Sequence, residues 1–208
     1  MDIHDLLEGK NLLIFDFDGT IADTSSLHAE AFSQTLRPLG LEPDYESIAG
    51  LKSSDAIRKC LESRRLARSE REIEFLVRTK QSIVRNLISA KLVALPGVNQ
   101  FLQLARTRFQ IAIASSGSKG TVNLALRKLG LERVFSAILC AEDVVNGKPS
   151  PEIFLKTLER FGRPPEDALI FEDSESGLSA AKRAGIESHD IRTSGWEPFA
   201  RYAEIYWK

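Results

Sequence analysis

The chain contains a series of short apolar segments, each ending in small or polar residues and separated from the next by helical patterns. Because the apolar runs are continuous rather than alternating, they predict strands buried on both faces, as in a parallel sheet covered by helices. We therefore expect an α/β fold with right-handed crossovers, in which ligands bind beyond the carboxyl ends of the strands. The segments are LLIFDFD (12–18), FQIAIAS (109–115), FSAILC (135–140) and DALIFED (167–173), with the weaker ESHDIR (187–192).

The helices between these segments have recognisable ends. Ser150 and Pro151 predict an N-cap followed by a first-turn proline. Gly130, Gly162 and Gly185 each follow a helical pattern, and each predicts the C-terminal end of its helix. Strands and helices therefore alternate along most of the chain.

One long region interrupts this alternation. From about Thr24 to Leu92 the sequence shows helical patterns and no convincing strand, which is too long a stretch for an ordinary crossover. We therefore expect a helical domain, residues 24–92, inserted into an α/β core domain made of residues 1–23 and 93–208.

Three helices are predicted inside the insertion. The first, SSLHAEAFSQTLRPLG, is broken at Pro38 and Gly40, and the second spans roughly 53–65. The third opens with Ser69 and Glu72 in the spacing of a capping box. Apolar residues then follow along one face of this third helix. They are Ile73, Leu76, Val77, Ile83, Val84, Leu87 and Ile88.

Composition and charge exclude several classes of partner. With 28 Lys+Arg against 29 Asp+Glu, the net charge of -1 gives no general attraction to nucleic acid or to a membrane. The apolar runs are far shorter than the roughly 20 residues that a membrane-spanning helix needs. Cys60 and Cys140 are single and distant, and the N-terminus lacks an apolar signal core. We expect a cytoplasmic protein, and a monomer.

Two carboxylates follow the first predicted strand. Alternation along a strand would point Asp16 and Asp18 to opposite faces, unless the chain curls after Asp16, which Gly19 permits. A pair of carboxylates is costly without a cation or a shared proton. The motif alone also fits an exposed turn at the end of a strand.

Polar residues also follow the other predicted strands or the loops between them. Ser115 and Ser116 end the second strand, Lys148 lies on a loop that leads into a helix, and Glu172 and Asp173 end the fourth strand. Each is a weak signal alone. Together they predict one site, because the carboxyl ends of parallel strands meet at one edge of the sheet.

At these positions the chain resembles the haloacid dehalogenase-like superfamily, specifically its small phosphatases with a helical cap. The resemblance covers nearly the whole chain and implies a Rossmann-like three-layer core with an inserted cap. It implies that Asp16 is a nucleophile that forms an aspartyl-phosphate, and that Asp18 is the general acid and then the general base. The matching motifs are DFDGT (16–20), Ser115 in IAIASSGS, Lys148 in NGKPSPEIF and Glu172-Asp173 in IFEDSESG.

The resemblance further implies a Mg²⁺ cofactor. Its ligands would be the Asp16 carboxylate, the Asp18 backbone carbonyl and the Asp173 carboxylate, which are the hard oxygen donors that Mg²⁺ prefers. Glu172 would be either a further ligand or a support for the site. Other residues would neutralise the phosphoryl oxygens. The phosphate-binding residues implied are Ser115, Ser116 and Lys148.

Two reactions share this machinery. One is hydrolysis of a small phosphorylated metabolite, and the other is a β-phosphoglucomutase-like isomerisation of a phosphosugar. Thr20 stands where the mutases typically have valine, and Ser53 stands where they place an arginine, whereas His28 matches a histidine found in both groups. We therefore expect a sugar-phosphate phosphatase resembling the fructose-1-phosphate phosphatases. A non-enzymatic relative that binds a phosphometabolite or a protein is a third alternative.

Two further features leave alternatives open. Lys52, Lys80 or a neighbouring arginine of the insertion could contact an anionic substrate, or could simply belong to a solvated helical surface. The aromatic tail GWEPFARYAEIYWK predicts a last helix packed onto the body, with a dimer contact as the alternative.

Overall fold

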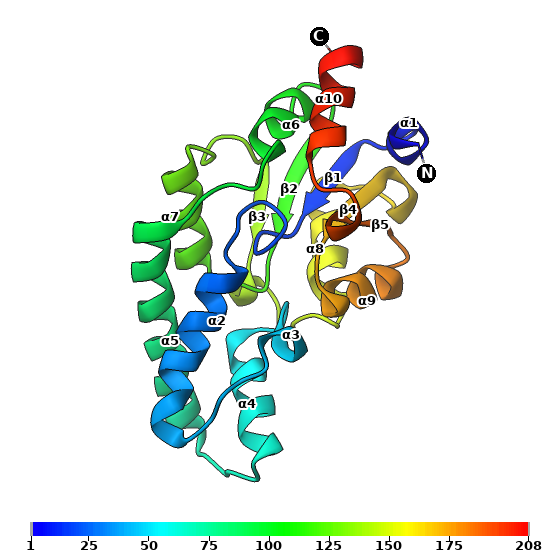
Figure 1. Ribbon diagram of the computed structural model, residues 1–208. Coiled ribbons are helices and arrows are strands. Elements are labelled where there is room, and N and C mark those ends of the chain that lie inside the picture. Colours follow the sequence, from blue (N-terminus) through cyan, green and yellow to red (C-terminus); the bar gives the residue numbers. More distant parts are fainter. Residues whose placement is uncertain (1, 208) are drawn as a thin grey trace.

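The computed structural model describes residues 2–207, and its centre is a parallel sheet of five strands. The strand order is β3-β2-β1-β4-β5, and every pairing is parallel (Figure 1). Each strand lies inside a predicted segment, so the expected α/β class is confirmed. The strands are β1 (Leu12–Phe15), β2 (Gln110–Ala114), β3 (Ala137–Leu139), β4 (Ala168–Glu172) and β5 (Glu187–Asp190).

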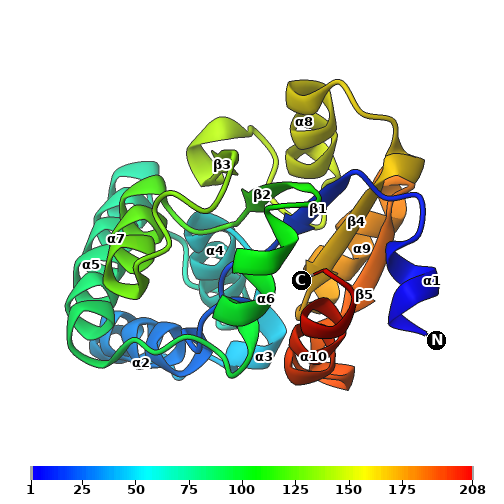
Figure 2. The same cartoon turned by 90° about the horizontal axis from the view of Figure 1, so that it is seen from above.

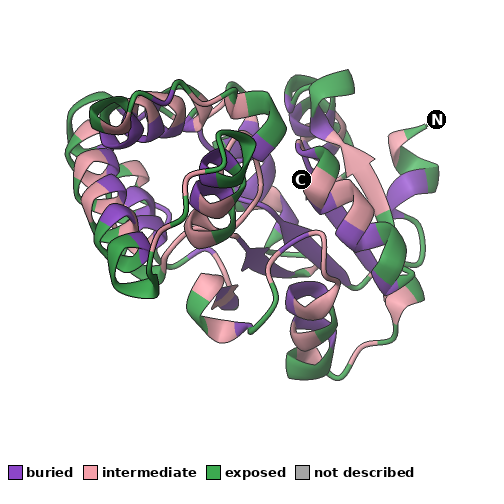
Figure 3. Cartoon of the chain, turned by 90° about the horizontal axis from the view of Figure 1, so that it is seen from below, coloured by how far each residue is buried: buried purple, intermediate pink, exposed green. Residues whose placement is uncertain are grey.

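Helices cover both faces of the sheet, because successive side chains along each strand enter different layers. In β1, Leu13 and Phe15 pack into one buried cluster, whereas Leu12 and Ile14 pack into another. Figure 2 shows the sheet between α8 and the pair α6 and α10, and Figure 3 shows its strands largely buried. The first cluster includes α1 (Ile3–Leu7), α6 (Val98–Ala105), α7 (Lys119–Leu129) and α10 (Glu197–Tyr206); the second includes α8 (Glu152–Phe161) and α9 (Glu175–Ala184).

The inserted helical segment, residues 24–92, lies between β1 and β2 in the chain and contains no strand. No helix within residues 2–207 is both long enough and apolar enough to cross a membrane. Figure 1 shows the inserted helices together beyond one end of the sheet. They are α2 (Ser25–Leu36), a 3₁₀ turn (Arg37–Leu39), α3 (Tyr45–Ile48), α4 (Ser53–Ser63) and α5 (Glu70–Lys91).

The inserted helical segment has an apolar cluster of its own, but α5 also reaches the main core. Val84 and Ile88, in the C-terminal half of α5, belong to the cluster that α7 shares. The long helix therefore connects the insertion to the α/β layers by packing as well as by sequence. The separate cluster consists of Phe32, Leu36, Leu41, Ile48, Ala56, Ile57, Cys60, Leu61, Ile73 and Leu76.

Most predicted helix ends are found where expected. Ser69 and Glu72 form the capping box of α5, and Gly130, Gly162 and Gly185 end α7, α8 and α9 with φ of 69°, 60° and 70°. One prediction was off by one residue. Helix α8 begins at Glu152 with Pro151 in the N-cap position, because the Pro151 carbonyl already accepts the first helical N–H groups.

The aromatic tail packs onto the body, as predicted. Trp196 and Phe199 are each 1% exposed, and their rings meet those of Phe15, Phe101 and Phe171. Helix α10 lies beside α6 (Figure 1). The end of the chain therefore completes one layer of the core.

Candidate active site

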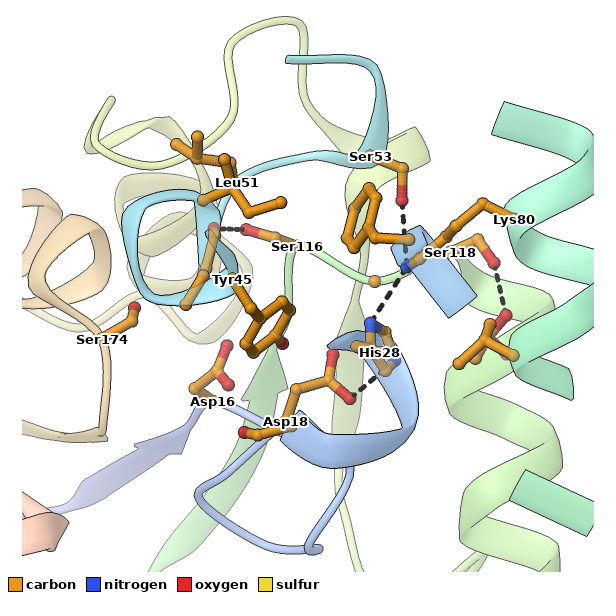
Figure 4. Close-up of a pocket in the computed structure, with 18 of the residues that line it drawn as sticks. Asp16, Asp18, His28, Tyr45, Leu51, Ser53, Lys80, Ser116, Ser118 and Ser174 are labelled. Carbon is orange, nitrogen blue, oxygen red and sulfur yellow. Dashed lines mark hydrogen bonds and ion pairs between the residues drawn. The ribbon is translucent and has the colours of Figure 1, made fainter. Parts of the chain in front are cut away.

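A small cavity of about 40 Å³ lies beyond the carboxyl ends of β1, β2 and β4. The inserted helical segment covers it (Figure 4). Asp16, Asp18, Asp173 and Ser116 line it from the sheet side. Four of the predicted site residues, which are far apart in the sequence, therefore meet in one place. Residues from the inserted segment that line the cavity include Ser25, His28, Phe32, Tyr45, Gly50, Leu51, Ser53, Lys80 and Gln81.

Lys148 joins two buried carboxylates. Its Nζ donates to Asp16 Oδ1 at 2.6 Å and to Glu172 Oε1 at 2.5 Å. Burial alone would lower the pKa of Lys148, but the charges of Asp16 and Glu172 raise it above its usual value, so the ammonium stays charged. Burial raises the pKa of Asp16 well above its usual range against the opposing effect of Lys148.

Glu172 is held on both oxygens. While Oε1 accepts from Lys148, Oε2 accepts the backbone N–H groups of Asp173 and Ser174 at 2.9 Å each. A side chain at Gly177 would lie 1.8 Å from Glu172 Oε1, so the glycine permits this close packing. Glu172 therefore fixes both Lys148 and the turn that carries Asp173.

Three carboxylates form a group that could hold a cation. One oxygen from each of Asp16, Glu172 and Asp173 lies within 4.8 Å of the others. Burial, followed by the charge of Glu172, raises the pKa of Asp173 to about 7, although Lys148 acts in the opposite direction. Hard, crowded oxygens of this kind fit a divalent cation such as Mg²⁺.

The catalytic loop, residues 16–23, makes the curl that the paired aspartates require. Gly19 has a φ of +81°, and its N–H donates to the Ala22 carbonyl at 2.9 Å. A Cβ at Gly19 would lie 2.0 Å from Asp173 Oδ2, so no other residue fits this turn. Because of the curl, Asp16 and Asp18 both line the cavity instead of pointing to opposite faces.

Asp18 is held by the start of the insertion. Thr24 Oγ1 donates to Asp18 Oδ1 at 2.7 Å, and His28 Nε2 lies 3.4 Å from the same oxygen without hydrogen-bond geometry (Figure 4). On its other side, His28 Nδ1 accepts from Lys80 Nζ at 3.0 Å. Lys80 also donates to Ser53 Oγ at 3.3 Å.

This chain of contacts sets the state of His28. Since Nδ1 accepts from an ammonium, the proton of the neutral ring is on Nε2 and faces Asp18. Burial lowers the pKa of His28 to about 4, so the ring is neutral near pH 7. Burial also lowers the pKa of Lys80 to about 8, partly opposed by Asp18. His28 is thus a neutral ring whose Nε2 lies beside the Asp18 carboxylate without a hydrogen bond to it.

The two predicted serines lie differently. Ser115 is fully buried after β2, and its Oγ accepts the Gly117 N–H at 2.9 Å. The Ser116 hydroxyl lines the cavity and donates to the Gly50 carbonyl of the insertion at 2.6 Å, and its binding of phosphate stays a prediction. Ser116 therefore ties the second strand end to the segment that covers the site.

The covering side of the cavity carries hydroxyl, amide and aromatic groups. Burial, together with the charges of Asp18, Asp173 and Asp16, raises the pKa of the Tyr45 phenol, so it stays neutral. Lys80 is the cation among the residues described as lining the cavity, and none of them is an arginine. We call these lining residues of the inserted segment the roof of the cavity. Most of the polar groups of the roof are neutral hydrogen-bonding groups.

Sequence reasoning left out part of this site. Thr24 and Tyr45 have no local signal, because their role depends on how the insertion folds back over β1. Lys80 was named only as one of several cations that could contact a substrate, although a local signal distinguishes it from the others. It follows Ile73 and Leu76 on the apolar face of α5, and a lysine within such a face is unusual unless it is partnered.

Comparison with known proteins agrees with this geometry. The family model described as haloacid dehalogenase-like hydrolase matches residues 13–191. The chain is 31% identical to the fructose-1-phosphate phosphatase YqaB of Escherichia coli, over 86% of this chain and 95% of that protein. It is 34% identical to a phosphorylated carbohydrates phosphatase of Thermotoga maritima, over 84% of this chain and 82% of that protein.

Among solved structures, a β-phosphoglucomutase from Clostridium difficile superimposes with a TM-score of 0.79 at 28% identity. The match covers 86% of this chain and 83% of that one. The family match and both sequence relatives extend over most of the sheet, the insertion and the cavity between them. The chain therefore belongs to the haloacid dehalogenase-like hydrolases.

Proposed function

We propose that the protein is a Mg²⁺-dependent phosphatase that hydrolyses a small phosphorylated metabolite, namely a sugar phosphate. The observation that carries this proposal is the environment of Asp16. Its carboxylate is buried, is bonded to Lys148 at 2.6 Å and lies in the group with Glu172 and Asp173. A carboxylate in these surroundings suits covalent catalysis on an anionic group.

In the proposed reaction, a carboxylate oxygen of Asp16 attacks phosphorus, and the bond from phosphorus to the substrate oxygen breaks. Asp18 gives its proton to that leaving oxygen. Asp18 then takes a proton from water, whose oxygen attacks the aspartyl-phosphate and releases inorganic phosphate and free Asp16. Lys148 and Ser115 offset the charge of the phosphoryl oxygens, where electrostatic stabilisation contributes most of the rate.

Asp16, Asp173 and the Asp18 carbonyl would hold Mg²⁺. When bound, this ion would supply positive charge at the phosphoryl oxygens. The oxygens of Glu172 are already engaged with Lys148 and with backbone N–H groups. We therefore assign Glu172 to the support of Lys148 and Asp173 rather than to direct ligation.

His28 and Thr24 would orient Asp18 for its two proton transfers. Thr24 Oγ1 fixes one carboxylate oxygen at 2.7 Å, and the neutral His28 ring faces it at 3.4 Å. Neither Thr24 nor His28 replaces Asp18 as the proton donor near pH 7. Burial lowers the pKa of His28 to about 4, so its ring is neutral at that pH. His28 therefore positions Asp18 and takes no proton itself.

We infer that residues 24–92 act as a cap that opens to admit substrate. A cavity of about 40 Å³ has room for only a few water molecules, too little for a sugar phosphate. Neutral roof groups such as Ser53, Gln81 and Tyr45 suit the hydroxyls of a sugar that carries one phosphate. The free, buried cysteines also support the proposal of a cytoplasmic enzyme, which we take to be a monomer.

The experiment is hydrolysis of an aryl phosphate and of a panel of sugar phosphates with and without Mg²⁺. We expect the Asp16→Asn variant and the chelated wild-type enzyme to lose activity by a factor of about 10³ or more, because the nucleophile or the cation is absent. Equal rates in wild type and Asp16→Asn would dismiss the proposal.

The isomerase remains the second candidate, because the likeness to a β-phosphoglucomutase covers most of the chain. β-Glucose 1-phosphate distinguishes the two reactions. A phosphatase gives glucose and phosphate, and we expect this result because Ser53 and the neutral roof offer no arginine for a second phosphate. Glucose 6-phosphate as the dominant product would make the enzyme a mutase.

A further inference from the structure

The C-terminal segment contributes to the catalytic loop, although it lies beyond residues 13–191 that match the family. We propose that Trp196 is a positioning residue, whose indole N–H holds the loop that carries Asp16 and Asp18. The expected effect of Trp196 on turnover rests on the proposed function. Its expected effect on the rigidity of the loop does not.

The contact is a single hydrogen bond between two segments that are distant in the sequence. Trp196 Nε1 donates to the Thr20 carbonyl at 2.6 Å, between residues 176 positions apart. Thr20 is fully buried and Trp196 is 1% exposed, so water cannot replace this donor. Among residues 2–207, Trp196 is the one that donates to this carbonyl.

Thr20 in turn contacts a predicted metal ligand. Its Oγ1 donates to Asp173 Oδ1 at 3.3 Å. The preceding residue, Gly19, packs so closely that an added Cβ would lie 2.0 Å from Asp173 Oδ2. A shift of Thr20, which follows from release of its carbonyl, would therefore disturb Asp173 through the Thr20 hydroxyl and the Asp18 backbone through Gly19.

The two halves of the catalytic loop are held by different segments. Its second half is bonded to the chain after α5, since Asp23 N–H donates to the Val93 carbonyl and Leu95 N–H donates to the Ile21 carbonyl. No residue of that segment donates to the Thr20 carbonyl among the bonds of the described chain. Nearer the cavity, Trp196 holds the Thr20 carbonyl, while the Asp16 N–H donates to the Phe171 carbonyl and the Ile21 N–H donates to the Phe17 carbonyl within the loop.

The indole itself is rigid, which allows it to act as a support. Its ring lies 4.9 Å from that of Phe171 and 5.2 Å from that of Phe101, between centroids. A Cβ at Gly97 would lie 3.0 Å from the Trp196 backbone carbon, so the main chain is also closely packed. The N–H is thereby fixed in place before any ligand binds.

The first test is amide hydrogen exchange in the metal-free protein, which needs no activity. The variants are Trp196→Phe, which keeps an aromatic ring and removes the N–H, and the matched control Trp207→Phe. Trp207 packs on the same Phe101 ring but makes no bond to the loop. We expect exchange in residues 16–23 to rise about three- to tenfold in Trp196→Phe only, as loss of one hydrogen bond gives. Equal exchange in both variants would overturn the proposal.

The second test measures Mg²⁺ affinity by calorimetry and turnover of an aryl phosphate. We expect Trp196→Phe to raise the Mg²⁺ dissociation constant and to lower kcat, each by about three- to tenfold, with little change in substrate KM. A merely structural role would leave Mg²⁺ affinity unchanged, and that result would count against the proposal. If even the wild type has no activity, the proposed function fails, while exchange and Mg²⁺ affinity still decide the role of Trp196.

A second variant covers the case in which Trp196→Phe does not fold. In a Trp207→Phe background, Trp196 is replaced biosynthetically by benzothienylalanine, in which sulfur takes the place of the indole N–H, or by 5-fluorotryptophan, which keeps it. We expect the first analogue to loosen residues 16–23 and the second to behave as wild type. Identical exchange with both analogues would overturn the proposal.

Discussion

Asp16 and Asp18 illustrate how the protein manages charges that should repel. Asp16 is paired with Lys148 at 2.6 Å, whereas Asp18 is bonded to Thr24 at 2.7 Å and faces a neutral histidine. The two carboxylates therefore have different surroundings, which suits one to attack and the other to transfer protons. Lys148 also stabilises the folded protein, because it is the cation between the two buried carboxylates of Asp16 and Glu172.

A Lys148→Met variant tests this contribution to stability. We expect the free energy of unfolding of the metal-free protein to fall by about 3–5 kcal/mol, since Asp16 and Glu172 would remain buried without a cation. Urea unfolding near pH 7 with a chelator measures this change. The exposed Lys182 gives the control, Lys182→Met, which should change stability by no more than about 0.5 kcal/mol. Similar values for both variants would contradict our account of Lys148.

At the scale of elements, α5 combines a structural face with a functional residue. Its buried positions are Ile73, Leu76, Lys80, Val84 and Ile88, so a lysine occupies a position that an apolar residue would fill better. Lys80 is bonded to His28 and Ser53 and lies 4.5 Å from the centre of the Phe32 ring. We interpret the buried Lys80 as a residue that lowers the stability of the folded protein and serves the candidate active site.

The Lys80→Met variant should therefore be more stable and less active. Burial lowers the pKa of Lys80 in the folded protein from 10.5 to about 8, so below pH 8 the folded state bears the cost of a buried charge. We expect the variant to gain about 1–3 kcal/mol in unfolding free energy near pH 7. As pH rises from about 8 towards 10, the wild type becomes more stable because the folded lysine releases its proton first, and the difference shrinks.

Urea unfolding at both pH values measures this effect, with turnover measured alongside. The control is Lys91→Met on the same helix, whose side chain is 59% exposed. It should show neither the gain nor the pH dependence. A loss of stability in Lys80→Met near pH 7 would contradict the interpretation.

The elements themselves were largely predictable, because their causes are local. Continuous apolar runs identified the strands, and Ser69 with Glu72 identified the start of α5. The four-residue α3 was missed, since so short a helix has no periodic pattern. The Trp196–Thr20 bond and the direction of Lys80 depend on packing between distant segments, which no local pattern encodes.

At the scale of the whole molecule, the loop between α3 and α4 of the inserted segment contacts several segments of the α/β core. The Ser116 hydroxyl donates to the Gly50 carbonyl at 2.6 Å, and the Ser176 hydroxyl donates to the Ala49 carbonyl at 3.1 Å. Lys52 of the cap donates to the carbonyls of Val144 and Val145 at 2.6 and 3.1 Å. These contacts lie on the loop of the cap that faces the strand ends, so they stabilise the closed arrangement.

A Lys52→Met variant should weaken this closure. We expect substrate KM to rise about three- to tenfold because bonds formed only in the closed arrangement are lost, whereas the unfolding free energy changes little. Steady-state kinetics with an aryl phosphate measures the effect. Lys59→Met, on the helix α4 that follows Lys52, is the control, because Lys59 donates to the Ser47 carbonyl within the cap. An equal KM for the two variants would show that Lys52 does not hold the cap.

The central claim is that Asp16 accepts the phosphoryl group in a pocket that Mg²⁺, Lys148 and Asp173 complete. A crystal structure with Mg²⁺ and beryllium trifluoride, which mimics a phosphoryl group on an aspartate, tests it most directly. We predict beryllium bonded to an Asp16 oxygen, a fluorine bonded to Lys148 Nζ, and Mg²⁺ held by Asp16, Asp173 and the Asp18 carbonyl. Beryllium on Asp18, or Mg²⁺ bound away from Asp16 and Asp173, would contradict it.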